Sequence, residues 1–310
     1  MTTVTFSIIT ACLNAQAFVA EAIESVVAQE VPSVEHVIVD GGSTDETLEI
    51  LKRYPDLKVI SEPDNGMYDA INKGIKIARG EWIGLLNADD LYPQGSLKQA
   101  LDAIMQNPNL QAVNGGYSVF EDEGHGRKIV RSSPSINAEE FWFRIVRGPT
   151  TPNTWFIRRS TFEHYGLFDH RYRYAADREM MMRLALSGIR PLSLPGENYL
   201  FRQHEGSATF SLQDSRNPRR GQIRMEVARE ALNIQEEYLV KISIPPEMRK
   251  ELVPDHSLSA YKLAVTALYH RKWGLFLDAI KRGCRYDRLW PLLFLVLVAK
   301  RIQKGFGLHA

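Results

Sequence analysis

The sequence predicts an α/β protein built on a mostly parallel sheet that is flanked by helices. Short apolar runs recur through the first half of the chain, and stretches with apolar residues three and four positions apart separate them. Strands that alternate with helices form right-handed βαβ units, which place neighbouring strands parallel. The 310 residues, 44% of them hydrophobic, are enough to bury a large core.

The order of the predicted elements divides the chain into two parts. The predicted strands cover residues 5–11, 34–39, 57–60, 82–86 and 111–113. Helical periodicity covers residues 17–29, 45–54, 67–78, 94–105 and 178–186. After about residue 212 the strand pattern disappears, and residues 217–221 have the composition of a linker into helices near 222–240 and 257–282. We expect a first domain over residues 1–215 and a helical region over residues 216–310.

Charge and cysteine content narrow the class of protein. Lys and Arg total 38 against 37 for Asp and Glu, and the formal net charge of +1 gives no broad electrostatic footprint for nucleic acid. Cys12 and Cys284 are far apart and lack metal-ligand spacing, which favours free thiols in a reducing compartment. The amino terminus lacks the basic segment of a secretory signal. We therefore expect a cytoplasmic protein that does not bind nucleic acid.

Two adjacent carboxylates follow the fourth predicted strand, in the run Asn87-Ala88-Asp89-Asp90. Open α/β sheets bind ligands at the carboxyl ends of their strands, and Mg²⁺ or Mn²⁺ takes one or two carboxylates together with substrate phosphates. Asp89 and Asp90 therefore fit a site for a cation and a diphosphate. The alternative is helix capping, because an acidic pair also suits the start of the helix predicted from residue 94.

Polar residues also follow the second and third predicted strands. Asp40 stands at the tip of the second strand, before a glycine pair, and its carboxylate can either contact a base or ribose or stabilise the turn. After the third strand, Asp64 and Gly66 belong to a turn. Asp69 and Asn72 lie three positions apart on the next helix, where they face either the same cleft or water.

Together these segments closely resemble family 2 glycosyltransferases. The resemblance rests on Asp-Gly-Gly-Ser-Thr-Asp from residue 40, on Ser-Glu-Pro-Asp-Asn-Gly-Met-Tyr-Asp-Ala-Ile-Asn-Lys-Gly from residue 61 and on Leu-Asn-Ala-Asp-Asp from residue 86, and it extends from about residue 5 to about residue 207. Within the family, the chain is most similar to bacterial enzymes of surface-polysaccharide assembly, including colanic-acid-type transferases. The resemblance implies a GT-A fold, a Rossmann-like sheet that binds a nucleotide-sugar with a divalent cation, Mn²⁺ or Mg²⁺.

The resemblance also implies roles for the polar residues of the first domain. By motif position, Asp40 contacts the base, Asp89 the ribose or the metal, and Asp90 the metal that bridges the diphosphate. The other residues assigned to the nucleotide-sugar site are Thr10, Ala11, Asn14, Asp64, Gly66, Asp69 and Asn87. Asn87 departs from the family pattern, whose carboxylate-X-carboxylate motif begins with Asp at this position, so only the last two residues of the motif carry charge.

The family pattern further expects a catalytic carboxylate beyond the metal motif, and Asp177 occupies that position. Inverting transfer needs a base that removes the proton of the acceptor hydroxyl while this hydroxyl attacks the anomeric carbon. Without the resemblance, Asp177 is better explained as an N-terminal residue of the helix predicted from residue 178. Glu179 is the neighbouring candidate for the base.

Residues 202–207 resemble the Arg-X-His-X-X-Ser ending of the family. The resemblance assigns Arg202 to the diphosphate charge and His204 to a metal or phosphate contact. A loop histidine is by itself more often a surface residue. The Gln-X-X-Arg-Trp element of processive members is absent near this region, which favours the addition of a single sugar.

The acceptor side and the C-terminal region carry weaker signals. Residues 147–155 are expected to shape the acceptor side, where Trp155 either stacks on a sugar or belongs to the core. The apolar run 289–299 is too short to span a bilayer, and basic residues flank it within residues 285–304. This run suits a membrane surface, a core helix or a dimer contact, of which we favour the membrane surface.

These observations predict an inverting, metal-dependent glycosyltransferase at the inner face of the cell membrane. We expect it to move one sugar from a nucleotide-diphosphate donor, a UDP-sugar first of all, to a saccharide or polyprenyl-linked acceptor in cell-surface polysaccharide synthesis. One alternative is a nucleotide-sugar binding module, which would need no base. Another is a phosphohydrolase with Asp40 as nucleophile, although the second carboxylate usual two positions later is replaced by Gly42. A nicotinamide oxidoreductase is excluded, because no Gly-X-Gly-X-X-Gly follows the first strand.

Overall fold

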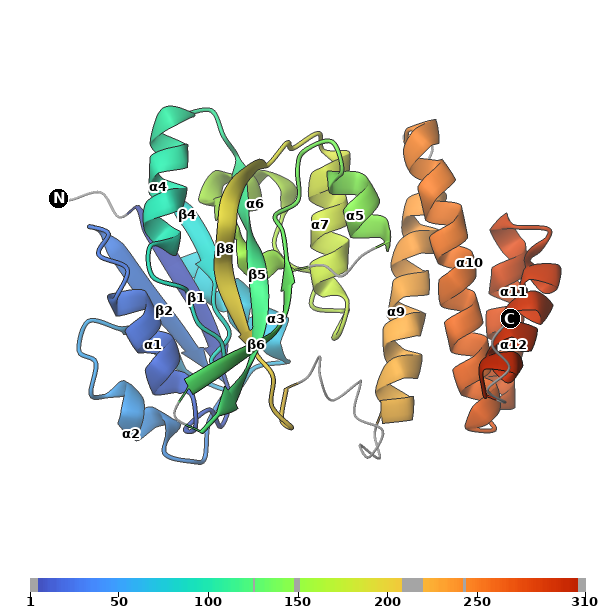
Figure 1. Cartoon of the computed structure of the whole chain (residues 1–310), viewed down its shortest axis with the longest axis horizontal. Helices are drawn as coiled ribbons and strands as arrows, with labels where there is room; N and C mark the ends of the chain where they lie inside the picture. Colours follow the sequence, from blue (N-terminus) through green and yellow to red (C-terminus); the bar gives the residue numbers. More distant parts are fainter. Residues whose placement is uncertain (1–4, 125, 148–150, 208–219, 242–243, 306–310) are drawn as a thin grey trace. The chain divides into compact units, whose positions relative to one another are not determined.

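The computed structural model describes residues 5–124, 126–147, 151–207, 220–241 and 244–305, with side chains to residue 299 (Figure 1). The chain forms two compact units, Met1–Phe210 and Ser211–Ala310. The domain boundary predicted at residue 215 and most of the linker predicted over residues 217–221 lie outside the described residues.

The first unit is built on an eight-stranded mixed sheet. Its strands are β1 (Phe6–Cys12), β2 (Val34–Asp40), β3 (Lys58–Ser61), β4 (Trp82–Leu85), β5 (Ala112–Glu123), β6 (Gly126–Ser133), β7 (Trp155–Arg158) and β8 (Leu192–Arg202). They follow the order β3-β2-β1-β4-β7-β5-β6, and β8 pairs with β5. The pairs among β1 to β4 and the pair β5–β8 are parallel, whereas β7 and β6 are antiparallel to their neighbours.

The first four predicted strands are confirmed, and the fifth is only the beginning of a longer strand. Residues 111–113 overlap the start of β5, which continues for 12 residues because nine of its positions in succession are buried. Neither β6 nor β8 is predicted by the sequence pattern. Most of β6 is exposed, and β8 mixes buried and exposed positions irregularly, so neither strand has a continuous or alternating apolar pattern.

The helices of the first unit lie on both faces of this sheet (Figure 1). They are α1 (Val19–Val27), α2 (Thr47–Leu51), α3 (Met67–Ile77), α4 (Ser96–Gln106), α5 (Phe141–Arg147), the 3-10 turn η1 (Pro152–Thr154), α6 (Arg159–Tyr165) and α7 (Ala176–Leu186). The helix predicted over residues 45–54 is shorter than expected. Asp45 Oδ1 accepts a hydrogen bond of 3.0 Å from the Thr47 backbone N–H, which makes residues 45 and 46 a turn ahead of α2.

Helices pack on both faces of the sheet, and on the α3 face the contact depends on a glycine. On the other face, α1 and α4 contribute Ala22 and Leu97 to a core with Phe6 and Trp82. On the α3 face, a Cβ atom on Gly74 would lie only 2.4 Å from Ile9 Cγ2. Only hydrogen at this position lets the helix axis approach β1 so closely.

The carboxyl ends of the parallel strands gather the polar loops at one edge of the sheet. Cys12 pairs with Asp40, and Asp40 pairs with Ser61, so the loops after β1, β2 and β3 begin side by side. The loop after β4 is joined to β8 by two backbone hydrogen bonds between Leu91 and Leu200, of 3.0 and 2.9 Å. The residues of the predicted site are therefore drawn to the edge where such sheets bind ligands.

The second unit is helical. Its described helices are α9 (Arg220–Leu239), α10 (Pro246–Tyr269), α11 (Trp273–Tyr286) and α12 (Trp290–Gly305). The single helix predicted over residues 257–282 is wrong, because α10 ends at residue 269 and Arg271 adopts a left-handed φ of 56° before α11 begins. No helix within the described part of the chain combines the length and apolar character needed to cross a membrane.

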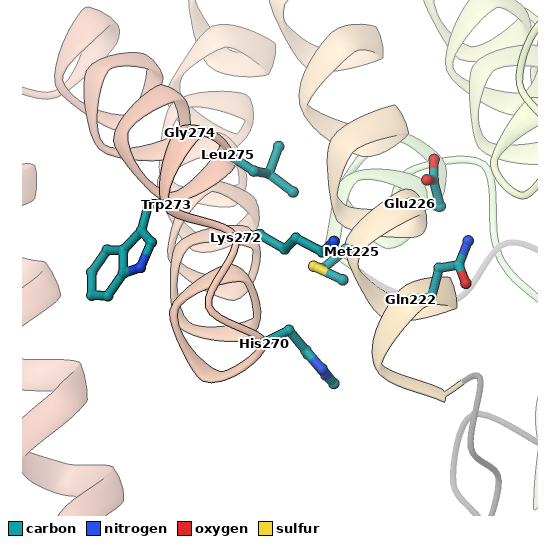
Figure 2. Close-up of a pocket in the computed structure, with 8 residues that line it drawn as sticks. All are labelled: Gln222, Met225, Glu226, His270, Lys272, Trp273, Gly274 and Leu275. Atoms are coloured by element: carbon teal, nitrogen blue, oxygen red, sulfur yellow. The ribbon is translucent and has the colours of Figure 1, made fainter.

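An open cavity of about 810 Å³ lies within the second unit (Figure 2). It is bounded by the start of α9 and by the turn between α10 and α11, and its lining residues are Gln222, Met225, Glu226, His270, Lys272, Trp273, Gly274 and Leu275. None of the site residues predicted from the sequence lines this cavity.

The close approach of α3 to the sheet predicts that Gly74→Ala destabilises the first unit. The added methyl group overlaps Ile9, and such overpacking costs about 1–3 kcal/mol in the free energy of unfolding. Higher helix propensity acts in the opposite direction by about 1 kcal/mol. Urea unfolding followed by circular dichroism measures the balance.

The matched control is Gly274→Ala in α11, where a Cβ atom meets no atom within 4 Å. This variant should be as stable as the unmodified protein or more stable. Equal effects of the two substitutions would contradict the tight packing of α3.

Candidate active site

Asp40 organises the loop after β2. It is fully buried, and its carboxylate accepts hydrogen bonds from the Gly42 backbone N–H at 3.1 Å, from Ser61 Oγ at 2.7 Å and from the backbone N–H and the hydroxyl of Ser43. Burial alone would raise the pKa of Asp40, but the bonds from Ser43, Ser61 and Gly42 outweigh it and hold the pKa below its usual value. Asp40 therefore stabilises the turn as a carboxylate, and its contact with a base stays a prediction.

The loop after β1 is joined to the loop after β2. Asn14 has a left-handed φ of 52°, its backbone N–H donates to Ser43 Oγ at 2.8 Å, and its Oδ1 accepts from the Thr44 backbone N–H at 2.8 Å. The predicted pocket residue Asn14 thus sets the shape of this edge. Ala11 is half-buried at the end of β1.

Thr10 points into the protein interior. It is fully buried, and its Oγ1 lies 2.9 Å from His36 Nε2. Burial lowers the pKa of His36 to about 3, so the imidazole is neutral at ordinary pH. The Thr10 side chain therefore supports the sheet beneath the predicted nucleotide pocket.

The predicted residues after β3 form a self-bonded turn. Asp64 Oδ1 accepts from the Gly66 backbone N–H at 2.7 Å, and Asp69 accepts from the Asn65 backbone N–H at 3.0 Å. The other Asp64 oxygen lies against Gly41, where a Cβ atom would come within 2.4 Å of it. Asp64 therefore lies against the loop that follows Asp40, whereas Asp69 accepts its hydrogen bond from Asn65 within the turn after β3.

Asp90 is the centre of a buried network in the loop after β4. The residue is 3% exposed, its Oδ1 accepts from the Arg202 backbone N–H at 2.8 Å, and its Oδ2 accepts from Tyr199 Oη at 2.9 Å and from Asn87 Nδ2 at 2.8 Å. Asn153 Nδ2 donates to Asn87 Oδ1 at 3.1 Å. Burial and the neighbouring Asp89 charge raise the pKa of Asp90, against these bonds. Both Asp90 oxygens are engaged inside the protein, and its role as a metal ligand stays a prediction.

Asp89 differs from Asp90 because it is partly open to solvent. Its Oδ2 lies 2.9 Å from His204 Nε2, and the imidazole packs against Phe18 with ring centroids 4.7 Å apart. The Gly206 backbone N–H donates to His204 Nδ1 at 3.2 Å, which assigns the imidazole proton to Nε2. The structure therefore brings together two of the three predicted metal ligands, from loops 115 positions apart.

Arg202 is buried beneath this pair. Its Nε donates to the Asp89 backbone oxygen at 2.9 Å, its Nη2 lies 3.0 Å from Glu21 Oε2, and its Nη1 pairs with Asp122. The guanidinium also lies 4.7 and 4.8 Å from the ring centroids of Phe18 and Phe120. Arg202 thus supports the Asp89 loop from below, and a diphosphate contact stays a prediction.

Asp89 and His204 would fit a divalent cation as a partial ligand set once His204 changes tautomer, because Nε2 can bind a cation only when the imidazole proton lies on Nδ1. Mn²⁺ accepts both carboxylate and imidazole ligands, and such cations often complete their coordination with water and substrate phosphates. Among the described residues, no cluster of three or more His, Cys, Asp or Glu side chains forms a complete protein cage. A cation held here would depend on the diphosphate for further ligands.

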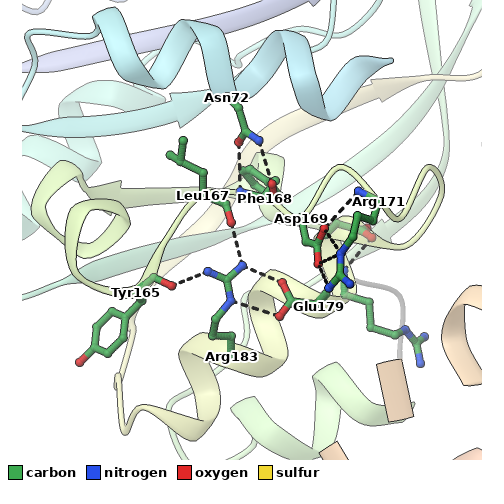
Figure 3. Close-up of polar contacts among 10 residues, drawn as sticks. Asn72, Tyr165, Leu167, Phe168, Asp169, Arg171, Glu179 and Arg183 are labelled. Atoms are coloured by element: carbon green, nitrogen blue, oxygen red, sulfur yellow. Dashed lines mark hydrogen bonds and ion pairs between the residues drawn. The ribbon is translucent and has the colours of Figure 1, made fainter. Parts of the chain in front are cut away.

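The predicted base lies on the first turn of α7. Asp177 is half-buried, and its Oδ1 accepts from the Arg178 backbone N–H at 2.7 Å. The neighbouring candidate Glu179 is instead paired with Arg183, whose Nη2 lies 2.6 Å from Glu179 Oε2 (Figure 3). Arg183 also donates to the backbone oxygens of Tyr165 and Leu167. Glu179 therefore has a structural partner, and the role of Asp177 as the base stays a prediction.

The loop before α7 is anchored to α3. Asn72 exchanges two hydrogen bonds with the Phe168 backbone, of 2.8 and 3.0 Å, so it faces this loop rather than water (Figure 3). Trp155 is 1% exposed and packs on Phe141, with ring centroids 5.0 Å apart. Trp155 belongs to the core, and residues 148–150 of the predicted acceptor segment lie outside the described part of the chain.

Two residues of the site were not singled out from the sequence. Tyr199 and Asn153 complete the Asp90 network from β8 and η1, 109 and 66 positions away from their partners in the loop. The only sequence signal for Tyr199 was its place just before the Arg-X-His-X-X-Ser segment. Asn153 lies within residues 147–155, which were expected to shape the acceptor side, but nothing in the sequence linked it to Asn87.

The fold is of the GT-A type, and solved structures share it. The mannosyltransferase PcManGT from Pyrobaculum calidifontis, in complex with GDP-Man and Mn²⁺, matches with a TM-score of 0.57 and 18% identity, over 98% of this chain and 88% of that protein. TarS 1-349 from S. aureus, in complex with UDP-GlcNAc, matches with a TM-score of 0.51 and 17% identity, over 93% and 92% of the two chains. At these identities the likeness concerns the fold.

Sequence comparison gives the particular family. Residues 7–166, slightly more than half of the chain, match glycosyl transferase family 2, and the protein belongs to this family. A PGL/p-HBAD biosynthesis glycosyltransferase of Mycobacterium bovis is 32% identical over 186 residues, which cover 57% of this chain and 68% of the relative. The uncharacterized glycosyltransferase EpsJ of Bacillus subtilis is 27% identical over 217 residues, which cover 66% and 62%.

The Asp90 network predicts that Asn87→Asp destabilises the protein. The substitution replaces the amide that donates to Asp90 by a carboxylate, so a partly buried hydrogen bond is lost. It also places another acid beside Asp90, whose pKa burial and Asp89 already raise to about 8. We expect the free energy of unfolding to fall by about 1–3 kcal/mol in urea titrations.

Asn137→Asp is the control, because Asn137 is exposed and its Oδ1 accepts from the Glu140 backbone N–H, as an aspartate oxygen also can. Its stability should change by less than about 0.5 kcal/mol. If Asn87→Asp behaved like this control, the network around Asp90 would not have the bonds described.

Proposed function

We propose that this family 2 glycosyltransferase transfers one sugar, with inversion, from a nucleotide-diphosphate donor in a reaction that requires a divalent cation. The observation that carries the proposal is the Asp89–His204 pair, 2.9 Å apart and partly open to solvent, above the buried Asp90 network at the carboxyl edge of the sheet. Acceptor and cation can approach such an exposed pair, while its buried neighbours keep it in place.

A nucleotide-sugar donor is supported by the fold and by the loops at this edge. The two structural neighbours were solved with GDP-Man and with UDP-GlcNAc, both nucleotide-diphosphate sugars. In this chain, the loops after β1, β2 and β3 converge through the bonds of Asn14, Asp40 and Asp64. We take a UDP-sugar as the first donor to test.

A divalent cation is supported by the chemistry of Asp89 and His204. PcManGT was solved with Mn²⁺. A bound cation would neutralise charge on the leaving diphosphate. The buried side chains of Asp90 and Arg202 would hold the Asp89 backbone still while the diphosphate binds, through the bonds that Arg202 makes to both carboxylate-bearing residues.

The base proposed for the transfer is Asp177. The acceptor hydroxyl oxygen forms a bond to the anomeric carbon, the bond from this carbon to the diphosphate oxygen breaks, and Asp177 takes the hydroxyl proton. Glu179, the neighbouring candidate, has a structural role, because Arg183 holds its carboxylate through two contacts of 2.6 and 3.2 Å. We propose a saccharide or polyprenyl-linked glycan of cell-surface polysaccharide synthesis as the acceptor.

The two alternative functions are less consistent with the molecule. A phosphohydrolase nucleophile must reach the phosphorus atom, whereas Asp40 is fully buried with both oxygens bonded. A binding module without activity conflicts with membership of a glycosyltransferase family.

Asp177→Asn should lower the transfer rate by about 10²–10⁴-fold, because the variant cannot accept the hydroxyl proton. Affinity for the donor should not change. Release of UDP from a UDP-sugar in the presence of an acceptor mixture measures the rate, and calorimetry measures donor affinity.

Asp102→Asn is the matched control, since Asp102 is an exposed carboxylate on α4 that pairs with Lys98. It should transfer at the unmodified rate. An active Asp177→Asn variant would exclude this residue as the base, and Glu179→Gln would then be the next variant to assay.

Asp89→Asn and His204→Gln should each remove most of the increase in UDP affinity that Mn²⁺ produces. A first-coordination ligand is lost in each case, while the buried Asp90 network is left intact. Calorimetric titration of UDP with and without Mn²⁺ measures this difference.

His164→Gln is the control, because His164 is exposed on α6, away from the loops at the carboxyl edge of the sheet. Mn²⁺-dependent affinity that persists in both test variants but disappears in Asp90→Asn would assign the cation to Asp90 instead. UDP binding that never responds to Mn²⁺ would contradict the metal proposal.

A further inference from the structure

Helix α12 has one packed side and one exposed side. On the packed side, Trp290 is 1% exposed and its Nε1 donates to the Ser257 backbone oxygen at 2.8 Å. Phe294 and Leu297 pack against the same core, where Tyr261 Oη donates to the Leu297 backbone oxygen at 3.2 Å. These contacts fix which side of α12 faces outward.

The outward side of α12 is apolar throughout its described residues. Leu292, Leu295 and Val296 are 62%, 63% and 50% exposed, and Leu289 just before the helix is 67% exposed. Spacings of three and four positions place 292, 295, 296 and 299 on one stripe. Single exposed apolar residues are normal on a protein, but a continuous stripe of this kind marks an interaction surface.

Positive charges predominate around this stripe. Residues 285–304 contain Arg285, Arg288, Lys300, Arg301 and Lys304, against the single acid Asp287. Arg288 is exposed at the start of the stripe. A second copy of this chain would present the same excess of cations, which is unfavourable for a two-fold contact through this helix. An anionic surface is complementary to them.

We propose that the outward side of α12, together with its flanking cations, binds the surface of an anionic lipid bilayer. The apolar stripe enters the boundary between headgroups and acyl chains, and the cations contact the headgroups. Because α12 is too short and too basic at its end to cross the membrane, it lies along the surface. This proposal depends only on side chains of the second unit, so it holds or fails independently of the proposed transfer reaction.

Vesicle flotation of the purified full-length chain tests the proposal. The protein should float with vesicles of phosphatidylcholine and phosphatidylglycerol, and less with phosphatidylcholine alone. Leu292→Gln/Leu295→Gln should reduce partition by about a hundredfold, because each large aliphatic side chain kept in water lowers partition by roughly tenfold. Arg288→Gln should reduce it by about fivefold on the anionic vesicles only, and added salt should weaken binding.

The matched control is Val27→Gln/Met105→Gln, which changes two apolar residues that are each 72% exposed in the first unit. It should float like the unmodified protein. Circular dichroism checks that the Leu292→Gln/Leu295→Gln variant is folded. If this variant is unfolded, the Arg288→Gln variant and the salt dependence of flotation test the proposal instead. The proposal is overturned if the unmodified protein fails to float with anionic vesicles, or if the folded leucine variant floats equally well. It is also overturned if this variant only converts a dimer to a monomer in analytical ultracentrifugation.

Discussion

The hydrogen bonds of the Asp90 carboxylate hold the loop after β4 against β8, and the geometry of the site depends on them. One oxygen accepts from the Arg202 backbone, and the other from Tyr199 and Asn87. Removing a carboxylate from water is costly unless every lone pair finds a donor, and here the donors come from both sides of the junction. Because Asp89 is the next residue in the same loop, its position is also fixed, although its side chain is partly open to solvent.

Arg202 extends this support to the rest of the first unit. Its guanidinium lies between Phe18, ahead of α1, and Phe120 of β5, and it pairs with Glu21 and Asp122. Both acids are about half exposed, so solvent weakens the ion pairs, and the two aromatic rings add cation–π attraction to the same guanidinium. One buried cation thus joins α1, β5, β8 and the Asp89 loop, which keeps the partly exposed Asp89–His204 pair preorganised.

Local patterns explain what the sequence could predict. The runs that form β1, β2 and β4 are buried on both faces and are therefore almost continuously apolar. Such runs predict strands without any knowledge of the strands that pair with them. The motif spacing put Asp89 and His204 in one site, but it could not separate Asp89 from Asp90, because exposure is decided by Tyr199 and Arg202 of β8. The break at Arg271 was equally hidden, since no glycine or proline marks it. The pairing of β8 with distant residues and the left-handed φ angle of Arg271 therefore could not be predicted from the neighbouring sequence.

The pairing of β8 with β5 also has a consequence for the order of events on the ribosome. Asp89 and His204 are 115 positions apart. At about 5–20 residues per second, the ribosome needs roughly 6–23 s to add the residues between them. The parallel strands β1 to β4 can pair during this interval, whereas the strand that delivers His204 does not yet exist. A nascent chain therefore carries the Asp89 loop without its histidine partner, and the Asp89–His204 contact can form only when the first unit is almost completely synthesised.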